Sequence, residues 1–231
     1  VTRTLRDFRL AGVDKDDATR QRIRDLSDSL TLIGQEFGRN IREDKSTVVC
    51  TADELEGMPA DWIAGHKPGA DGKITLTCEY PDAVPVFNYA KNESLRKRMF
   101  MAYNNRAFPS NIGVLDRMRM RRHELATTMG FASFADYVTA DKMVGSAANA
   151  RDFIGRVVAA SQDKQAREYQ QLLARKQKDV PGATEVNFWE VNYYKEAVRR
   201  TDYNFDSQSI RPYLPFDQVK QGVLDVTEIG R

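Results

Sequence analysis

A long amphipathic stripe near the start of the chain constrains the fold more than any other feature. Its apolar residues recur at spacings of three and four: Ile23, Leu26, Leu30, Ile33, Phe37 and Ile41. This period predicts a helix of roughly seven turns that begins near Asp16, where acidic side chains complement the helix dipole. A helix of this length must bury its stripe against another helix. We therefore expect a mainly α-helical lobe.

A small β element is expected near residues 46–80. Apolar and polar residues alternate from Ile74 to Tyr80, which predicts a strand ended by Pro81. A lone strand is not stable, so the β-prone segment 47–50 is its expected partner. Between them, a capping-box pattern at 51–54 and Pro59 each predict a short helix.

From residue 92 onward, caps and breakers divide the chain into helices. Ser133 with Asp136 caps a short helix, Gly130 ends the helix before it, and a long helix runs from Gly145 to Pro181. The helix after Pro109 is expected to bury the stripe Ile112, Leu115, Met118, Leu125 and Met129. The aromatic cluster of Phe188, Trp189, Tyr193 and Tyr194 is interpreted as core in preference to a ligand platform. We treat residues 1–231 as one helical portion, with a division into 1–91 and 92–231 as the alternative.

Charge and cysteine usage limit the partners. The 231 residues carry 35 basic and 33 acidic side chains, so we expect neither nucleic acid nor a membrane as partner. The arginines and lysine at 96–98, 117, 119, 121 and 122 are accordingly interpreted as a solvated face. Cys50 and Cys78 are expected as buried thiols, with a single bridge as the alternative. Because the chain begins at Val1, we expect sequence upstream of it.

No catalytic or metal-binding residue can be assigned from the residues alone. His123-Glu124 begins a zinc-peptidase H-E-x-x-H pattern, but the second ligand position is Thr127. The other histidine, His66, is interpreted as a loop residue. Neither a G-x-S-x-G elbow nor a glycine-rich phosphate loop occurs. The substrate-binding residues are unknown at this stage.

Several motifs together nevertheless resemble one family. The chain reads Ala102-Tyr103-Asn104-Asn105-Arg106, then Arg122-His123-Glu124-Leu125-Ala126, and then Met129 to Tyr137, Trp189-Glu190-Val191-Asn192-Tyr193-Tyr194 and Ile210 to Pro215. In order and spacing these motifs closely resemble the thimet oligopeptidase, neurolysin and oligopeptidase A family of zinc metallopeptidases. Glu190 stands where that family has Asp. The resemblance covers nearly the whole chain.

The resemblance implies a helical lobe beside a deep, narrow channel that admits short peptides. It implies zinc in the full-length parent, held by an H-E-x-x-H segment that is absent here, so this chain alone should be inactive and hold no zinc. Asn104, Arg106, Gly130 and Asp136 should have structural roles. We assign the parent to the cytoplasm, with the periplasm as alternative. The alternative function is a free-standing helical peptide- or protein-binding module.

A lobe separated from its catalytic partner should expose apolar side chains. The expected exposed residues are Phe188, Trp189, Tyr193, Val219 and Val223. Exposed apolar patches favour association, so weak self-association is expected.

Overall fold

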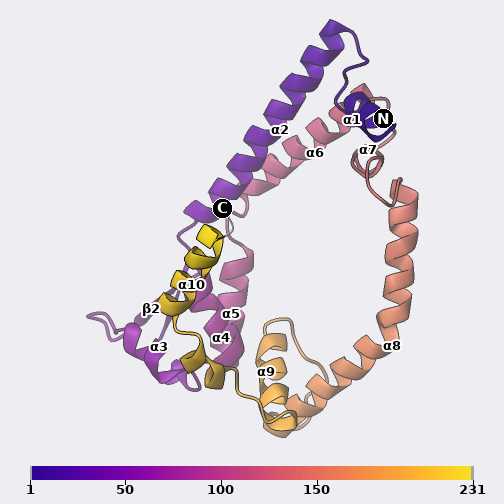
Figure 1. Ribbon diagram of the computed structural model, residues 1–231. Helices are drawn as coiled ribbons and strands as arrows, with labels where there is room; N and C mark the ends of the chain where they lie inside the picture. The colour runs from indigo at the N-terminus through magenta and orange to yellow at the C-terminus, as the bar shows by residue number, and fades with distance from the viewer. Residues whose placement is uncertain (1, 230–231) are drawn as a thin grey trace. The chain divides into compact units, whose positions relative to one another are not determined.

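A computed structural model describes residues 2–229 of the chain (Figure 1). Helices dominate it, as expected, and the described β structure is one two-stranded sheet. The residues form two compact units, each built from two stretches of chain: 2–46 with 104–165, and 47–103 with 166–229. A cut between residues 91 and 92 therefore passes through the second unit. No helix of the described residues is long and apolar enough to cross a membrane.

The first unit is organised around two antiparallel helices, α2 (Asp17–Glu43) and α6 (Ser110–Thr128). Asp16 caps α2 as expected, because its side chain accepts a hydrogen bond of 2.9 Å from the Thr19 amide. Ile23 and Leu26 are buried in a cluster with Leu125 and Met129 at one end of the pair. The stripe predicted for the first long helix is thus covered by another helix.

The stripe predicted for α6 was partly wrong. Leu125 is 5% exposed and Met129 is buried, but Ile112 and Leu115 are 52% and 48% exposed. The buried positions in the first half of α6 are Asn111 and Val114. Asn111 accepts a hydrogen bond from the Asn40 amide group and donates one to the Phe37 carbonyl. A polar residue therefore marks the inner face, because α2 supplies its hydrogen-bond partners.

Shorter elements complete the first unit. They are α1 (Thr2–Leu10), which the sequence analysis did not predict, α7 (Phe134–Thr139) and the first half of α8 (Ala147–Asp179). Gly130 has φ +90° and the Phe131 amide donates to the Ala126 carbonyl, so α6 ends in a glycine C-cap as predicted. The Ser133 side chain caps α7 by accepting from the Asp136 amide.

The second unit contains the predicted hairpin partners. Strand β1 (Thr47–Cys50) pairs antiparallel with β2 (Ile74–Thr77), and Cys50 lies opposite Ile74. Between them lie the short helices η1 (Asp53–Leu55) and α3 (Ala60–Gly65). The sheet covers a core with α4 (Tyr80–Tyr89) and α5 (Glu93–Asn104). Leu76, Val86, Leu95 and Met99 are fully buried there.

The predicted strand is shorter than expected, because Tyr80 begins helix α4 and does not extend β2. Pro81 lies in the first turn of α4, where a missing amide proton costs nothing. Pro85 lies inside the same helix and cannot donate to the Pro81 carbonyl four residues back. The Trp62 indole nitrogen donates to that carbonyl instead, at 2.9 Å. This contact from α3 explains how a segment with two prolines is helical.

Cys50 and Cys78 are both buried and form no disulfide, as favoured from the sequence. Cys50 pairs with Ile74 at one end of the hairpin, and Cys78 follows the other end of β2. Four residues of strand separate their positions by about 13 Å, well beyond the 4.4–6.8 Å between the Cα atoms of a disulfide.

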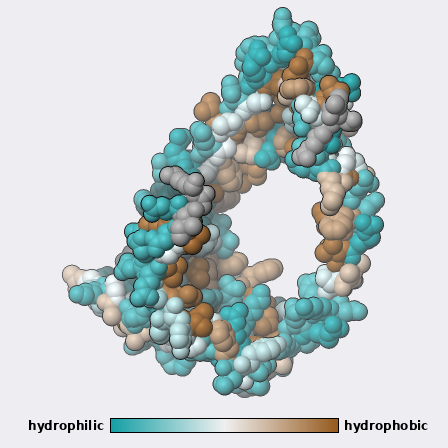
Figure 2. Space-filling view, in the orientation of Figure 1, coloured by the Kyte–Doolittle hydropathy of each residue, from teal (hydrophilic) through white to brown (hydrophobic). Residues whose placement is uncertain are grey.

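The rest of the second unit consists of the second half of α8, α9 (Val191–Asp202), η2 (Ser207–Tyr213) and α10 (Phe216–Ile229). Figure 2 shows apolar side chains on the surface of α8. In the first half of α8, which belongs to the first unit, these side chains are Phe153, Ile154, Val157 and Val158, and each is about half exposed. Only Lys176 of α8 is fully buried.

Candidate functional site

The His123-Glu124 pair lies on α6 in a structural setting. His123 is exposed, and the Thr127 hydroxyl donates to the backbone carbonyls of His123 and Glu124. The Glu124 carboxylate forms ion pairs with Arg22 and Arg121. Glu124 therefore links α6 to α2. Thr127 stands where zinc binding would require the second imidazole.

The described residues do not fit a zinc ion. Within residues 2–229, no group of three or more histidine, cysteine, aspartate or glutamate side chains is arranged to hold a metal. A catalytic zinc takes three protein ligands of these types. The donors in this described part of the chain therefore do not match the zinc that the resemblance implies for the parent.

His66 lies in the loop directly after α3, as predicted, and its ring makes several specific contacts. Its ring stacks on Trp62 with centroids 3.7 Å apart, and its Nε2 lies 2.9 Å from the Asp82 carboxylate. Its Nδ1 lies 2.7 Å from the Trp62 carbonyl oxygen. Asp82 also accepts hydrogen bonds from the amide and hydroxyl of Thr77. His66 therefore fastens α3 to the junction of β2 and α4, which is a structural role.

The motif at 189–194 organises a different part of the second unit. Glu190 is 1% exposed, and its carboxylate lies 2.6 Å from the Lys176 ammonium on α8. The same carboxylate accepts hydrogen bonds from the backbone and side-chain amides of Asn187. Burial alone would raise the pKa of Glu190, but these bonds hold its pKa below the ordinary value. Glu190 is therefore a buried carboxylate anchored just before α9.

The aromatic residues of this motif connect α9 to α5. The Trp189 indole donates to Glu93, and its ring packs against Phe100. Tyr194 is buried, whereas Phe188 is 82% exposed, so the interpretation of the cluster as core holds for only part of it. Trp189 and Tyr193 are half-buried and contact α5 residues. Trp189 and Tyr193 were expected to be exposed, and these contacts correct that expectation, whereas Phe188, Val219 and Val223 are exposed as expected.

Arg96 is the functional candidate that the sequence analysis missed. It was assigned to a solvated face, but it is 2% exposed. Its guanidinium donates to the backbone carbonyls of Ala90 and Lys91 and lies 4.2 Å from the centre of the Tyr193 ring. Among the described residues no carboxylate forms an ion pair with it. Burial lowers the pKa of Arg96, yet a guanidinium stays charged at neutral pH.

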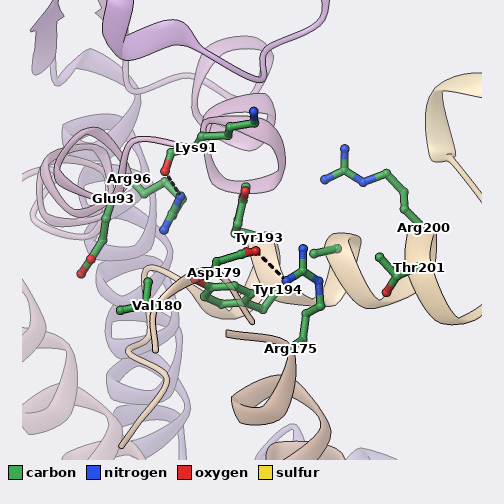
Figure 3. A pocket seen from close by; sticks show the side chains of 11 residues that line it. Lys91, Glu93, Arg96, Arg175, Asp179, Val180, Tyr193, Tyr194, Arg200 and Thr201 are labelled. Atoms are coloured by element: carbon green, nitrogen blue, oxygen red, sulfur yellow. Dashed lines mark hydrogen bonds and ion pairs between the residues drawn. The ribbon is translucent and has the colours of Figure 1, made fainter. Parts of the chain in front are cut away.

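Arg96 forms part of the wall of a pocket of about 520 Å³ (Figure 3). The pocket lies wholly within the second unit, between α5, α8 and α9. Its other walls come from aromatic, small apolar and charged side chains. They are Lys91, Glu93, Arg175, Asp179, Val180, Tyr193, Tyr194, Ala197, Arg200 and Thr201. Its size is typical of small-molecule sites.

Each remaining basic residue of the predicted solvated face contacts a carboxylate or an aromatic ring. Arg98 bonds Glu54 and the Val49 carbonyl, and Arg117 bonds both oxygens of the Glu36 carboxylate. Lys97 lies 4.7 Å from the centre of the Trp189 ring. Arg98, Arg117, Arg119 and Arg121 form exposed or half-exposed ion pairs, which contribute little stability each, and Arg122 lies over the Phe134 ring.

The four residues expected to have structural roles lie in turns and caps. The Asp136 carboxylate accepts from the Ser133 hydroxyl and the Ala147 amide, so it joins α7 to the start of α8. Arg106 is half-buried in the turn after α5, where Asn104 is the last residue of the helix. The pKa of Asp44 is lowered first by the Ala107 amide and, to a lesser degree, by the charge of Arg106.

The sequence of this chain is similar to those of known peptidases. The model of peptidase family M3 matches residues 86–229, which include α5 to α9, the Glu190 motif and the pocket. The chain belongs to peptidase family M3. This result confirms the resemblance drawn from the motifs and favours a peptidase portion over a free-standing binding module.

Individual relatives of this M3 chain have peptidase names. It is 28% identical to "Oligopeptidase A" of Salmonella typhimurium over 99% of its own length and 36% of the relative. It is 25% identical to "Saccharolysin" of Saccharomyces cerevisiae, over 99% of the chain and 33% of that protein. It is 27% identical to "Probable thimet oligopeptidase" of Arabidopsis thaliana, over 97% of the chain and 31% of that protein. The chain thus spans about a third of the length of the curated relatives it matches.

Proposed function

We propose that residues 1–231 form the non-catalytic, N-terminal channel-wall lobe of a zinc-dependent oligopeptidase that hydrolyses short peptides. The observation that carries this proposal is the similarity over 99% of the chain to a third of an oligopeptidase A. The described residues contain no set of zinc ligands, so the ion would be held by residues outside this chain. The parent is proposed to act in the cytoplasm.

Within this function, each of the two units contributes its own packed helices. In the first unit the α2–α6 pair is held by buried side chains, and in the second the helices around Glu190 are held by buried side chains and hydrogen bonds. The chemistry would belong to another part of the protein.

The test compares two proteins from the same gene: this chain, and the product extended to the length of the relatives. An internally quenched peptide of about ten residues is the substrate. We expect the extended product to cleave it, a zinc chelator to abolish cleavage, and this chain to cleave nothing with or without zinc. An extended product without peptidase activity, or zinc-dependent cleavage by this chain, would contradict the proposal.

A further inference from the structure

The pocket bounded by α5, α8 and α9 carries more positive charge than its own carboxylates neutralise. Lys91, Arg96, Arg175 and Arg200 line it together with only two carboxylates, Glu93 and Asp179. Figure 3 shows these four basic side chains arranged around the same open space. The lining therefore has a net charge of about +2 at neutral pH.

Two of the four cations have carboxylate partners, which leaves Arg96 and Arg200 with one lining carboxylate, Glu93, and a net charge of about +1. Arg175 bonds Asp179 at 2.8 Å, and Lys91 bonds Glu56 at 2.7 Å. Among the described residues, neither Arg96 nor Arg200 forms an ion pair with a carboxylate. Their charges are the ones that a ligand would meet.

Of the two arginines, Arg96 gives the stronger indication of an anionic ligand because its side chain is almost fully buried. Its Nε has no hydrogen-bond partner among the described residues, and the same holds for Nε of Arg175. Removing a charge from water is costly unless an opposite charge or hydrogen bonds compensate it. Two backbone carbonyls and the more distant charges of Glu190 and Glu93 compensate the burial of Arg96 only in part. A nearby anion would complete the compensation.

The guanidinium of Arg96 is also held in place before any ligand arrives. Two hydrogen bonds and the Tyr193 ring fix its plane. A group fixed in this way loses little conformational entropy on binding. Tyr193, Tyr194, Val180 and Ala197 add apolar surface to the walls, which suits a molecule with a carbon skeleton better than a bare ion.

We propose that this pocket binds a small molecule bearing two or more carboxylate or phosphate groups, through Arg96 and Arg200. Nothing in this proposal depends on peptidase activity. Guanidinium groups suit both kinds of oxyanion, since their planar donors pair with two oxygens at once. Arg96 acts as the fixed inner contact, and Arg200 acts from the exposed rim.

The test is isothermal titration calorimetry of this chain with citrate and, separately, with tripolyphosphate. Glycerol at equal concentration is the uncharged control. The key variant is Arg200→Gln, because Arg200 is exposed and its loss breaks no ion pair among the described residues. Lys195→Gln is the matched control: it makes the same charge change on α9, but Lys195 is exposed on another face of the helix and does not line this pocket. Circular dichroism checks that each variant is folded.

We expect one of the two anions to bind, Arg200→Gln to weaken it about tenfold, and Lys195→Gln to change the Kd by less than about twofold. Preference for citrate or tripolyphosphate distinguishes a carboxylate ligand from a phosphate ligand. Absence of binding by both anions overturns the proposal. Equal weakening in both variants also overturns it, because that result indicates general attraction to a basic surface. The same titration on the extended gene product should give a similar Kd, and loss of binding there would overturn the proposal.

Discussion

The ammonium of Lys176 lies 2.6 Å from the carboxylate of Glu190, and both side chains are buried. The pair joins α8 to the residue that precedes α9, and two amides of Asn187 complete the coordination of the carboxylate. A buried pair of this kind contributes little net stability as a pair, but breaking it leaves an uncompensated charge. Its role is to fix how the two helices meet beside the pocket.

Glu190→Gln should destabilise the second unit by about 3 kcal/mol, since it leaves the Lys176 ammonium buried without its counterion. Both tryptophans, Trp62 and Trp189, lie in the second unit, so intrinsic fluorescence during urea unfolding reports on that unit alone. Glu185→Gln is the control, because Glu185 is exposed, and it should cost less than about 0.5 kcal/mol. Equal midpoints for the two variants would contradict the structural role of the pair.

Acid should destabilise the second unit below about pH 4.5. The pKa values of Glu190 and Asp82 are both held below their ordinary values: burial opposes this shift, but hydrogen bonds from Lys176 and Asn187, and from Thr77, outweigh it. A carboxyl with a depressed folded-state pKa adds stability above its unfolded-state value, 4.5 for Glu190 and 3.8 for Asp82, and loses it as pH falls.

The measurement is the tryptophan-detected unfolding free energy between pH 7 and pH 3. Above pH 5, Glu190 and Asp82 should contribute little to the pH dependence of the unfolding free energy. Below pH 4.5, we expect the unfolding free energy to decline. Glu190→Gln should show a shallower decline, because one of the linked protons is gone. An unchanged slope in that variant would show that Glu190 is not linked to folding.

Leu125→Ala should destabilise the first unit by about 2–5 kcal/mol, because Leu125 is buried against α2. Leu115→Ala on the same helix should cost less than about 1 kcal/mol, since Leu115 is half exposed. Unfolding of each variant is monitored by the loss of helical circular dichroism. Hydrogen exchange of the α6 amides reports the stability of this helix in both variants. Similar losses for the two leucines would place the inner face of α6 at Leu115.

Weak self-association is expected through α10. Phe216, Val219, Val223 and Val226 are all exposed and recur at spacings of three, four and three, which is typical of helices that pair. Val223→Glu should lower the association detected by sedimentation over a concentration series. Gln218→Glu adds the same charge off this stripe and should leave association unchanged. A chain that is strictly monomeric at all concentrations would contradict this expectation.

Local patterns were sufficient for much of the fold. The period of three and four from Ile23 to Ile41 identified α2, Asp16 and Ser133 identified helix starts, and Gly130 identified a helix end. These features depend on neighbours within one turn, so they can be read without knowledge of the tertiary structure. The order and spacing of the longer motifs identified the family, because they record which residues the fold uses together.

Tertiary contacts decided the rest. In the helix from Tyr80 to Tyr89, Trp62 on another helix donates to the carbonyl that Pro85 leaves without a backbone donor. The inner face of α6 includes Asn111 and not Leu115, because Asn40 and the Phe37 carbonyl meet it there. Arg96 is buried because carbonyls of the preceding turn and the ring of Tyr193, far along the chain, surround it. In each case a polar group contacts at least one residue from a distant part of the sequence, and only the folded chain brings that residue within reach.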